Sequence, residues 1–128
     1  MRICPGAGTL GARIEDVDLA RDPSDEHLAE ILAALGEFGV LCFPGQSVNT
    51  ERFAEVGRLF GDLAVNIANQ FHEPGFPEVM ILSNKVVDDH PIGLGDAGQD
   101  WHTDQSYSTE ISLANILHAL EVPRRNGK

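Results

Sequence analysis

The sequence predicts one α+β domain over residues 1–128, with two helices in the first half of the chain and strands before, between and after them. Two stretches carry apolar residues at helical spacing, and each begins at a residue type that caps helices well. Short apolar runs bounded by glycine or proline predict the strands. A chain of this length buries enough surface on folding for one hydrophobic core.

The first elements expected are a strand, a helix and a second strand. Apolar and polar residues alternate over 10–14, which is typical of a half-buried strand. Ser24 precedes two acidic residues and is expected to cap a helix over 25–38, which Gly39 would end. The run 40–43 is wholly apolar and is followed by Pro-Gly, which predicts a strand covered on both faces.

A second helix and several strands are expected to follow. Asn49 or Thr50 can cap a helix that carries apolar residues on one side and closes at Gly61. The rest of the chain is expected to consist of loops over 64–78 and 87–100 and strands over 79–82, 101–107 and 112–121.

Charge and composition exclude several classes of function. The chain has 9 Lys and Arg against 20 Asp and Glu, so nucleic acid is not an expected partner. The one basic cluster, Arg124, Arg125 and Lys128, is expected to be a solvated loop. There is no apolar run of about 18 residues to cross a membrane and no apolar secretory signal, so a cytoplasmic protein is expected. Cys4 and Cys42 make no disulfide framework, and Cys42 is expected to be a buried thiol.

One pair of residues points to chemistry. His102 and Asp104 are two residues apart, and on a strand such side chains share a face with Cα atoms about 6.5 Å apart. An imidazole and a carboxylate placed in this way can bind one metal ion, as the local half of a two-histidine, one-carboxylate iron site. The alternative is a histidine that forms a salt bridge with a neighbouring acid. The glycine-rich segment 87–100 before the pair favours the metal site, because ligands gather on such loops.

Four segments of the chain resemble one family when their order and spacing are taken together. Gly39 to Gln46 reads Gly-Val-Leu-Cys-Phe-Pro-Gly-Gln, Phe60-Gly61 closes the second helix, and 10–12 with 17–19 matches an opening strand. The most specific segment is 96–107, which contains Trp-His-Thr-Asp. These segments resemble the TauD/TfdA family of iron(II)- and 2-oxoglutarate-dependent dioxygenases.

The resemblance implies a partial double-stranded β-helix, or jelly roll, with two flanking N-terminal helices. His102 and Asp104 would be two of three ligands to Fe(II), with 2-oxoglutarate as cosubstrate and dioxygen as oxidant. The reaction implied is hydroxylation of a small organic acid, as in taurine dioxygenase. Asn66 and Tyr107 are candidates for substrate contacts, although 66–69 and Gly98 differ from the pattern expected for taurine itself.

The resemblance also leaves parts of the family's site unmatched. The distal histidine, the 2-oxoglutarate-binding arginine and a Gly-Asp-Thr segment have no counterpart here, so we expect the N-terminal portion of a dioxygenase domain that is inactive alone. A missing C-terminal half or a homo-oligomer would complete it. The alternatives are a non-catalytic interaction module that keeps the first half of the fold, and a metal sensor that recruits His72 or His90.

Overall fold

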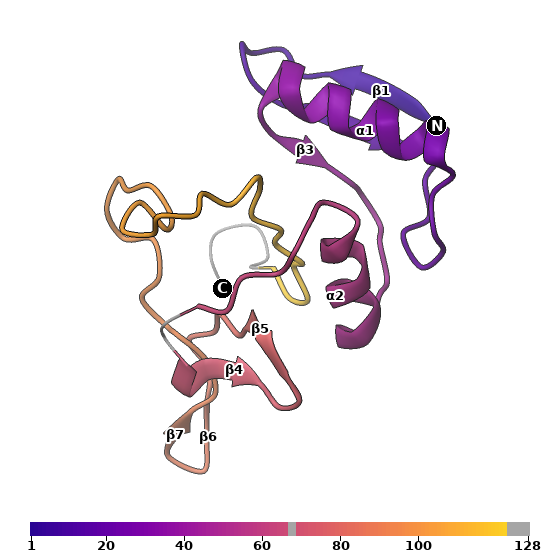
Figure 1. The fold of residues 1–128 in the computed structure, drawn as a ribbon. Helices are drawn as coiled ribbons and strands as arrows, with labels where there is room; N and C mark the ends of the chain where they lie inside the picture. Colours follow the sequence, from indigo (N-terminus) through magenta and orange to yellow (C-terminus); the bar gives the residue numbers. More distant parts are fainter. Residues whose placement is uncertain (67–68, 123–128) are drawn as a thin grey trace.

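The structure, a computed structural model, describes residues 1–66 and 69–122. The basic cluster at Arg124, Arg125 and Lys128 lies outside the described residues. Figure 1 shows two helices, small sheets and a long irregular segment at higher residue numbers. In chain order the elements are β1 (Arg2–Pro5), β2 (Ala12–Glu15), α1 (Asp25–Phe38), β3 (Leu41–Cys42), α2 (Thr50–Arg58), the 3-10 helix η1 (Asn69–Phe71), β4 (His72–Glu73), β5 (Phe76–Met80), β6 (Val86–Val87) and β7 (His90–Pro91).

The N-terminal sheet has the order β1-β2-β3, and α1 packs against it (Figure 1). β1 pairs antiparallel with β2, and β2 pairs parallel with β3. The alternation that predicts the first strand is confirmed, because Ala12 and Ile14 are buried together with Ile31 and Ala34 of α1. Leu10 lies outside the strand and is exposed, and β1 was not predicted at all.

Helix α1 begins and ends at the predicted residues. The Ser24 side chain accepts a hydrogen bond from the amide of His27 at 3.2 Å. Gly39 adopts φ 69° and its amide donates to the Leu35 carbonyl oxygen at 2.8 Å. A left-handed residue at this position is how many helices end, and glycine adopts it without steric cost. Both boundaries are therefore set by local hydrogen bonds.

The prediction of a strand covered on both faces over 40–43 is wrong. Only Leu41 and Cys42 form β3, and the Cys42 side chain is exposed rather than buried. The physical reason is the position of β3 at the edge of its sheet, where it pairs with β2 alone among the described residues. An edge strand has one open side, so an apolar run does not by itself prove burial.

Helix α2 starts as predicted but ends early. The Asn49 side chain accepts from the amide of Arg52 at 2.8 Å, which caps the first turn. The helix closes at Arg58, three residues before the predicted end at Gly61. Gly61 follows with φ 137°, a conformation open mainly to glycine, so it marks the exit of the chain rather than the helix cap.

Two side chains at the start of α2 fasten it to the loop that follows β2. Gln46 accepts a hydrogen bond from the Leu19 amide at 2.8 Å and donates to the Val17 carbonyl at 3.0 Å. Arg52 donates through Nε to the Leu19 carbonyl at 2.7 Å and pairs with Asp22 at 2.9 Å. We call these contacts the Gln46–Arg52 clamp. The clamp ties the start of α2 and the segment before it to the loop between β2 and α1, and Figure 1 shows α2 between the N-terminal sheet and the β4–β5 hairpin.

The second part of the chain differs most from expectation. A hairpin, β4–β5, lies in the predicted loop 64–78, and β5 ends at Met80 within the predicted strand 79–82. A second hairpin, β6–β7, lies across the start of the predicted loop 87–100. Asp88 and Asp89 form its turn with φ 49° and 61°, and positive φ at both central residues suits a tight hairpin.

The predicted strands at 101–107 and 112–121 are also wrong. Neither forms a ladder with another part of the chain that the structure describes. The segment 112–121 nevertheless alternates between half-buried and exposed residues over most of its length, as a strand would. The pattern predicted the extended shape, but a strand also needs a hydrogen-bonded neighbour. The α+β class stands, whereas the partial jelly roll remains a prediction. Over residues 1–66 and 69–122, no helix has the length and apolar character to span a bilayer.

The Gln46–Arg52 clamp yields the first prediction. Gln46→Ala removes three hydrogen bonds and leaves the part-buried Leu19 amide without an acceptor. We expect the free energy of unfolding to fall by about 1–3 kcal/mol, measured by urea denaturation. Gln99→Ala, at an exposed position, is the control and should stay within about 0.5 kcal/mol of the parent. Equal losses in the two variants would contradict the clamp.

Candidate metal centre

The side chains of His102 and Asp104 face each other at the start of a tight turn. His102 Nε2 lies 3.1 Å from Asp104 Oδ1. The pair lies in a loop, not on the predicted strand, and the turn begins at Asp104 and continues through Gln105, which has φ 51°. The amide of Ser108 donates to the Gln105 carbonyl at 2.9 Å and closes this turn. The two side chains therefore meet in irregular backbone just before this turn, rather than on the pleat of a strand.

A backbone carbonyl sets the orientation of the His102 ring. The Asp100 carbonyl oxygen lies 2.7 Å from Nδ1, and because a carbonyl only accepts, Nδ1 carries the proton that is donated. Nε2 is then the nitrogen left to face Asp104, and a neutral ring presents its lone pair there. Gly98 has φ 74°, and a Cβ atom added to it would lie 3.7 Å from Cε1 of the His102 ring. The loop therefore passes close to the imidazole.

The same surroundings favour the protonated ring when no metal is bound. The hydrogen bond to the Asp100 carbonyl, and next the negative charge of Asp104, raise the pKa of His102 above its ordinary value of 6.5. An imidazolium that faces a carboxylate is the salt bridge considered as the alternative from sequence. The geometry accommodates both states, because a metal ion and a proton compete for the same nitrogen.

A second side chain holds Asp104 from the other side. Asn115 Nδ2 donates to Asp104 Oδ2 at 2.6 Å. One step along the loop, the Ser112 hydroxyl donates to the Gln105 side-chain oxygen at 2.7 Å. Sequence reasoning missed Asn115, since an asparagine eleven residues away carries no spacing signal. The loop is thus tied to the segment that follows it by side chains.

The donor atoms fit two positions of an octahedral metal site. For bonds of about 2.0–2.2 Å, two donors at right angles around one ion lie about 3 Å apart. The observed 3.1 Å matches this, and both side chains are about half exposed, at 54% and 53%. No cluster of three or more His, Cys, Asp or Glu that could hold a metal occurs within 1–66 and 69–122. The described residues therefore offer one pair of candidate ligands.

The other candidate histidines do not join this pair. The His72 ring donates through Nε2 to the Asn66 carbonyl oxygen at 3.0 Å, within the region of the β4–β5 hairpin. His90 is exposed in β7. Neither belongs to a three-residue metal cluster in the described part of the chain, which argues against the metal-sensor alternative in the form that recruits them.

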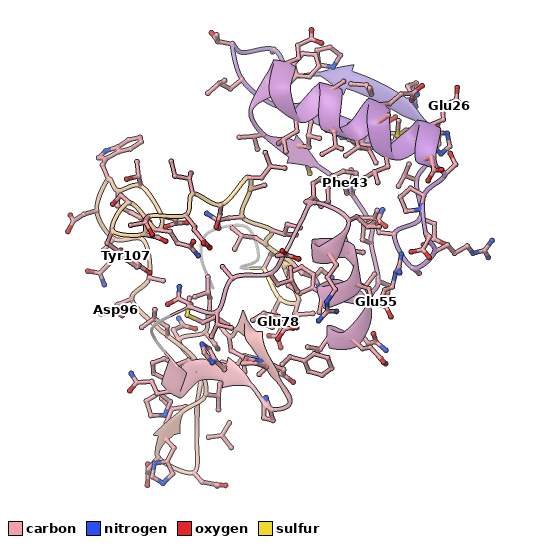
Figure 2. The ribbon with its side chains drawn as sticks, viewed as in Figure 1. Glu26, Phe43, Glu55, Glu78, Asp96 and Tyr107 are labelled. Atoms are coloured by element: carbon pink, nitrogen blue, oxygen red, sulfur yellow. The ribbon has the colours of Figure 1, made fainter. Side chains whose placement is uncertain are left out.

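A cavity of about 720 Å³ opens beside the pair. Figure 2 places Tyr107 on the long irregular loop, across the molecule from Glu26 of α1. Tyr107 and Asn66, the two candidates for substrate contacts, both lie on the cavity wall with His102 and Asp104. The apolar part of the wall includes Phe53, Phe60, Leu63, Val79, Met80, Leu82, Leu113, Ile116 and Leu117. A molecule with a hydrocarbon body would bury surface here within reach of the pair.

Comparison with known proteins decides the family. The family described as taurine catabolism dioxygenase TauD, TfdA family, matches residues 2–128. The chain belongs to this family. Pentalenolactone F synthase of Streptomyces arenae is 37% identical over 125 residues, which cover 96% of this chain and 42% of that protein. The resemblance read from the sequence motifs is therefore confirmed.

Two solved TauD-type structures resemble the fold. A Burkholderia xenovorans protein assigned as an alpha-ketoglutarate-dependent taurine dioxygenase has a TM-score of 0.61 and 30% identity, over 67% of this chain and 31% of that chain. A taurine dioxygenase from the same organism has a TM-score of 0.58 and 28% identity, over the same shares. The chain thus spans less than half the length of each of these relatives.

The charge of Asp104 should be visible in the titration of His102. Asp104→Asn removes a negative charge beside the ring, so we expect the pKa of His102 to fall. The hydrogen bond to the Asp100 carbonyl remains and should keep part of the upward shift. The measurement is an NMR titration of the His102 ring in metal-free protein. Asp89→Asn, the same change in the β6–β7 turn, is the control and should leave the pKa of His102 where it is. No response to Asp104→Asn would mean that the two groups do not meet in solution.

Proposed function

We propose that this chain carries part of the iron site of a 2-oxoglutarate-dependent dioxygenase that hydroxylates a small organic acid. His102 and Asp104 would be two of the three protein ligands. The observation that supports this most directly is the 3.1 Å separation of Nε2 and Oδ1, at the spacing of neighbouring donors around one ion, in a member of the TauD/TfdA family. The Burkholderia xenovorans relative whose name specifies alpha-ketoglutarate dependence agrees with the proposed cosubstrate.

When bound, iron(II) together with 2-oxoglutarate would supply the activation of dioxygen. The residues of the chain have simpler tasks. The Asp100 carbonyl keeps the proton on His102 Nδ1 and leaves Nε2 for the metal. The apolar wall excludes water and holds the hydrocarbon part of a substrate near the pair. Tyr107 and Asn66 would add polar contacts that orient it.

The cavity also limits the class of substrate. Its described wall contains no Lys or Arg, so the acidic group of a substrate finds no fixed cationic side chain among these residues. The group would have to pair with the bound metal or with residues outside the described wall. What the described wall recognises is therefore the apolar body of the substrate. Carboxylates and sulfonates with a hydrocarbon body fit this description, and so do lactones, for which the 37% identical relative is named.

Metal binding provides the decisive test of the proposed ligands. In an anaerobic calorimetric titration with Fe(II), we expect His102→Ala and Asp104→Ala each to weaken binding by about tenfold or more, because each removes one of two described donors. The matched controls are His90→Ala and Asp89→Ala in the β6–β7 hairpin, which should bind as the parent does. If the site variants and the controls bind equally, the interaction-module alternative is favoured.

Turnover tests the reaction rather than the ligands. In a protein that joins this chain to the missing third ligand and 2-oxoglutarate-binding arginine, we expect a substrate from a panel of small carboxylates, sulfonates and lactones to increase succinate formation from 2-oxoglutarate, measured by mass spectrometry. Tyr107→Ala should raise the KM for that substrate without changing Fe(II) affinity, since Tyr107 lines the cavity but is not a proposed ligand. Val87→Ala, at an exposed position in β6, is the control. Equal KM values in the two variants would remove Tyr107 from the proposed pocket.

A further inference from the structure

The hydrogen bond from Asn115 to Asp104 divides the carboxylate between two partners. Oδ1 faces His102 Nε2 at 3.1 Å, and Oδ2 accepts from Asn115 Nδ2 at 2.6 Å. An amide donor has no negative charge of its own, so it satisfies one oxygen without competing for a cation at the other. The two oxygens of Asp104 therefore have different environments before any metal arrives.

The different partners of the two Asp104 oxygens matter because of the way a carboxylate binds a cation. A free carboxylate can bind a cation through one oxygen or through both, and it rotates easily when exposed. Asp104 is 53% exposed and lies in a loop without ladder hydrogen bonds, so little else in the described chain restricts its rotation. A charge-assisted hydrogen bond at 2.6 Å is of the strong class and opposes rotation of the group.

The local sequence adds to the case for a positioning role. Asn115 is the one polar residue in the run Leu113-Ala114-Asn115-Ile116-Leu117, which forms part of the cavity wall. Leu113 and Leu117 have most of their surface exposed. Packing within this run therefore does not account for an asparagine at position 115. The amide of Asn115 instead reaches back eleven residues to Asp104. The Ser112–Gln105 hydrogen bond beside it holds the two segments in register.

We propose that Asn115 is a positioning residue of the metal site, which holds Asp104 Oδ2 so that Oδ1 alone is presented beside His102 Nε2. This inference rests on the proposed function, because it assumes that Asp104 is a metal ligand. A carboxylate held in this way occupies one coordination position rather than two. The positions that remain are then open to a chelating cosubstrate and dioxygen.

The test uses Co(II) alone as the probe, with affinity and the visible ligand-field spectrum as readouts. Asn115→Leu keeps the approximate volume of the side chain and removes the donor. We expect it to weaken Co(II) binding about 10- to 100-fold and to change the spectrum, as loss of a partner of a metal ligand does elsewhere. Asn115→Gln restores an amide and should recover part of the affinity. Asn84→Leu, at an exposed position outside the loop, should bind as the parent does.

A double variant separates positioning from a general structural effect. If Asn115 acts through Asp104, then Asn115→Leu should weaken binding no further once Asp104→Ala is present. An equal additional loss in that background would overturn the inference. So would parent-like affinity and spectrum in Asn115→Leu while Asp104→Ala is impaired. If Asp104→Ala binds Co(II) as the parent does, the proposed function itself fails and the inference fails with it.

Discussion

The carboxylate of Asp104 is the group on which the site depends. One of its oxygens must face His102, and the other must be satisfied, or the side chain turns in solvent and the pair comes apart. The structure meets both needs with contacts of 3.1 Å and 2.6 Å. The Asp100 carbonyl orients the imidazole of His102 by accepting a hydrogen bond from Nδ1. Each proposed ligand therefore has one orienting partner. The two proposed ligands and their two partners form a chain of contacts from Asp100 to Asn115, and most of it is local in sequence.

This network lies in a loop, and the fold supports it indirectly. The Gln46–Arg52 clamp ties the start of α2 to the loop that follows β2. Further along α2, Arg58 pairs with Glu78 of β5 at 2.7 Å, so the β4–β5 hairpin is attached to the same helix. α2 and β5 then form one side of the cavity that His102 and Asp104 border. α2 is thus anchored near its start to the loop after β2 and at its end to β5, and residues between these points line the cavity that the pair borders.

What the sequence could predict follows from the range of the interactions. The boundaries of α1 depend on Ser24 and Gly39, which bond to residues three and four positions away, and these were predicted correctly. β1 depends on a pairing partner that no local pattern identifies. The exposure of Cys42 has the same origin, because an apolar run shows a preference for burial but not whether a neighbour covers it. The β4–β5 hairpin does have a local signal, the Pro74-Gly75 turn with φ 84° at Gly75, which the prediction of a loop over 64–78 did not use.

The range of the interactions also explains which residues of the candidate site could be predicted. His102 and Asp104 were found because they are only two residues apart in sequence, although the sequence predicted a strand where the structure has a loop. Asn115 was not found, because its role exists only once the chain has folded back across eleven residues. A metal held by only the two proposed ligands would bind weakly, so each proposed ligand would gain more from being fixed before binding than it would in a closed cage. We therefore expect metal affinity to depend most strongly on His102 and Asp104, and after them on Asn115, which the sequence did not indicate.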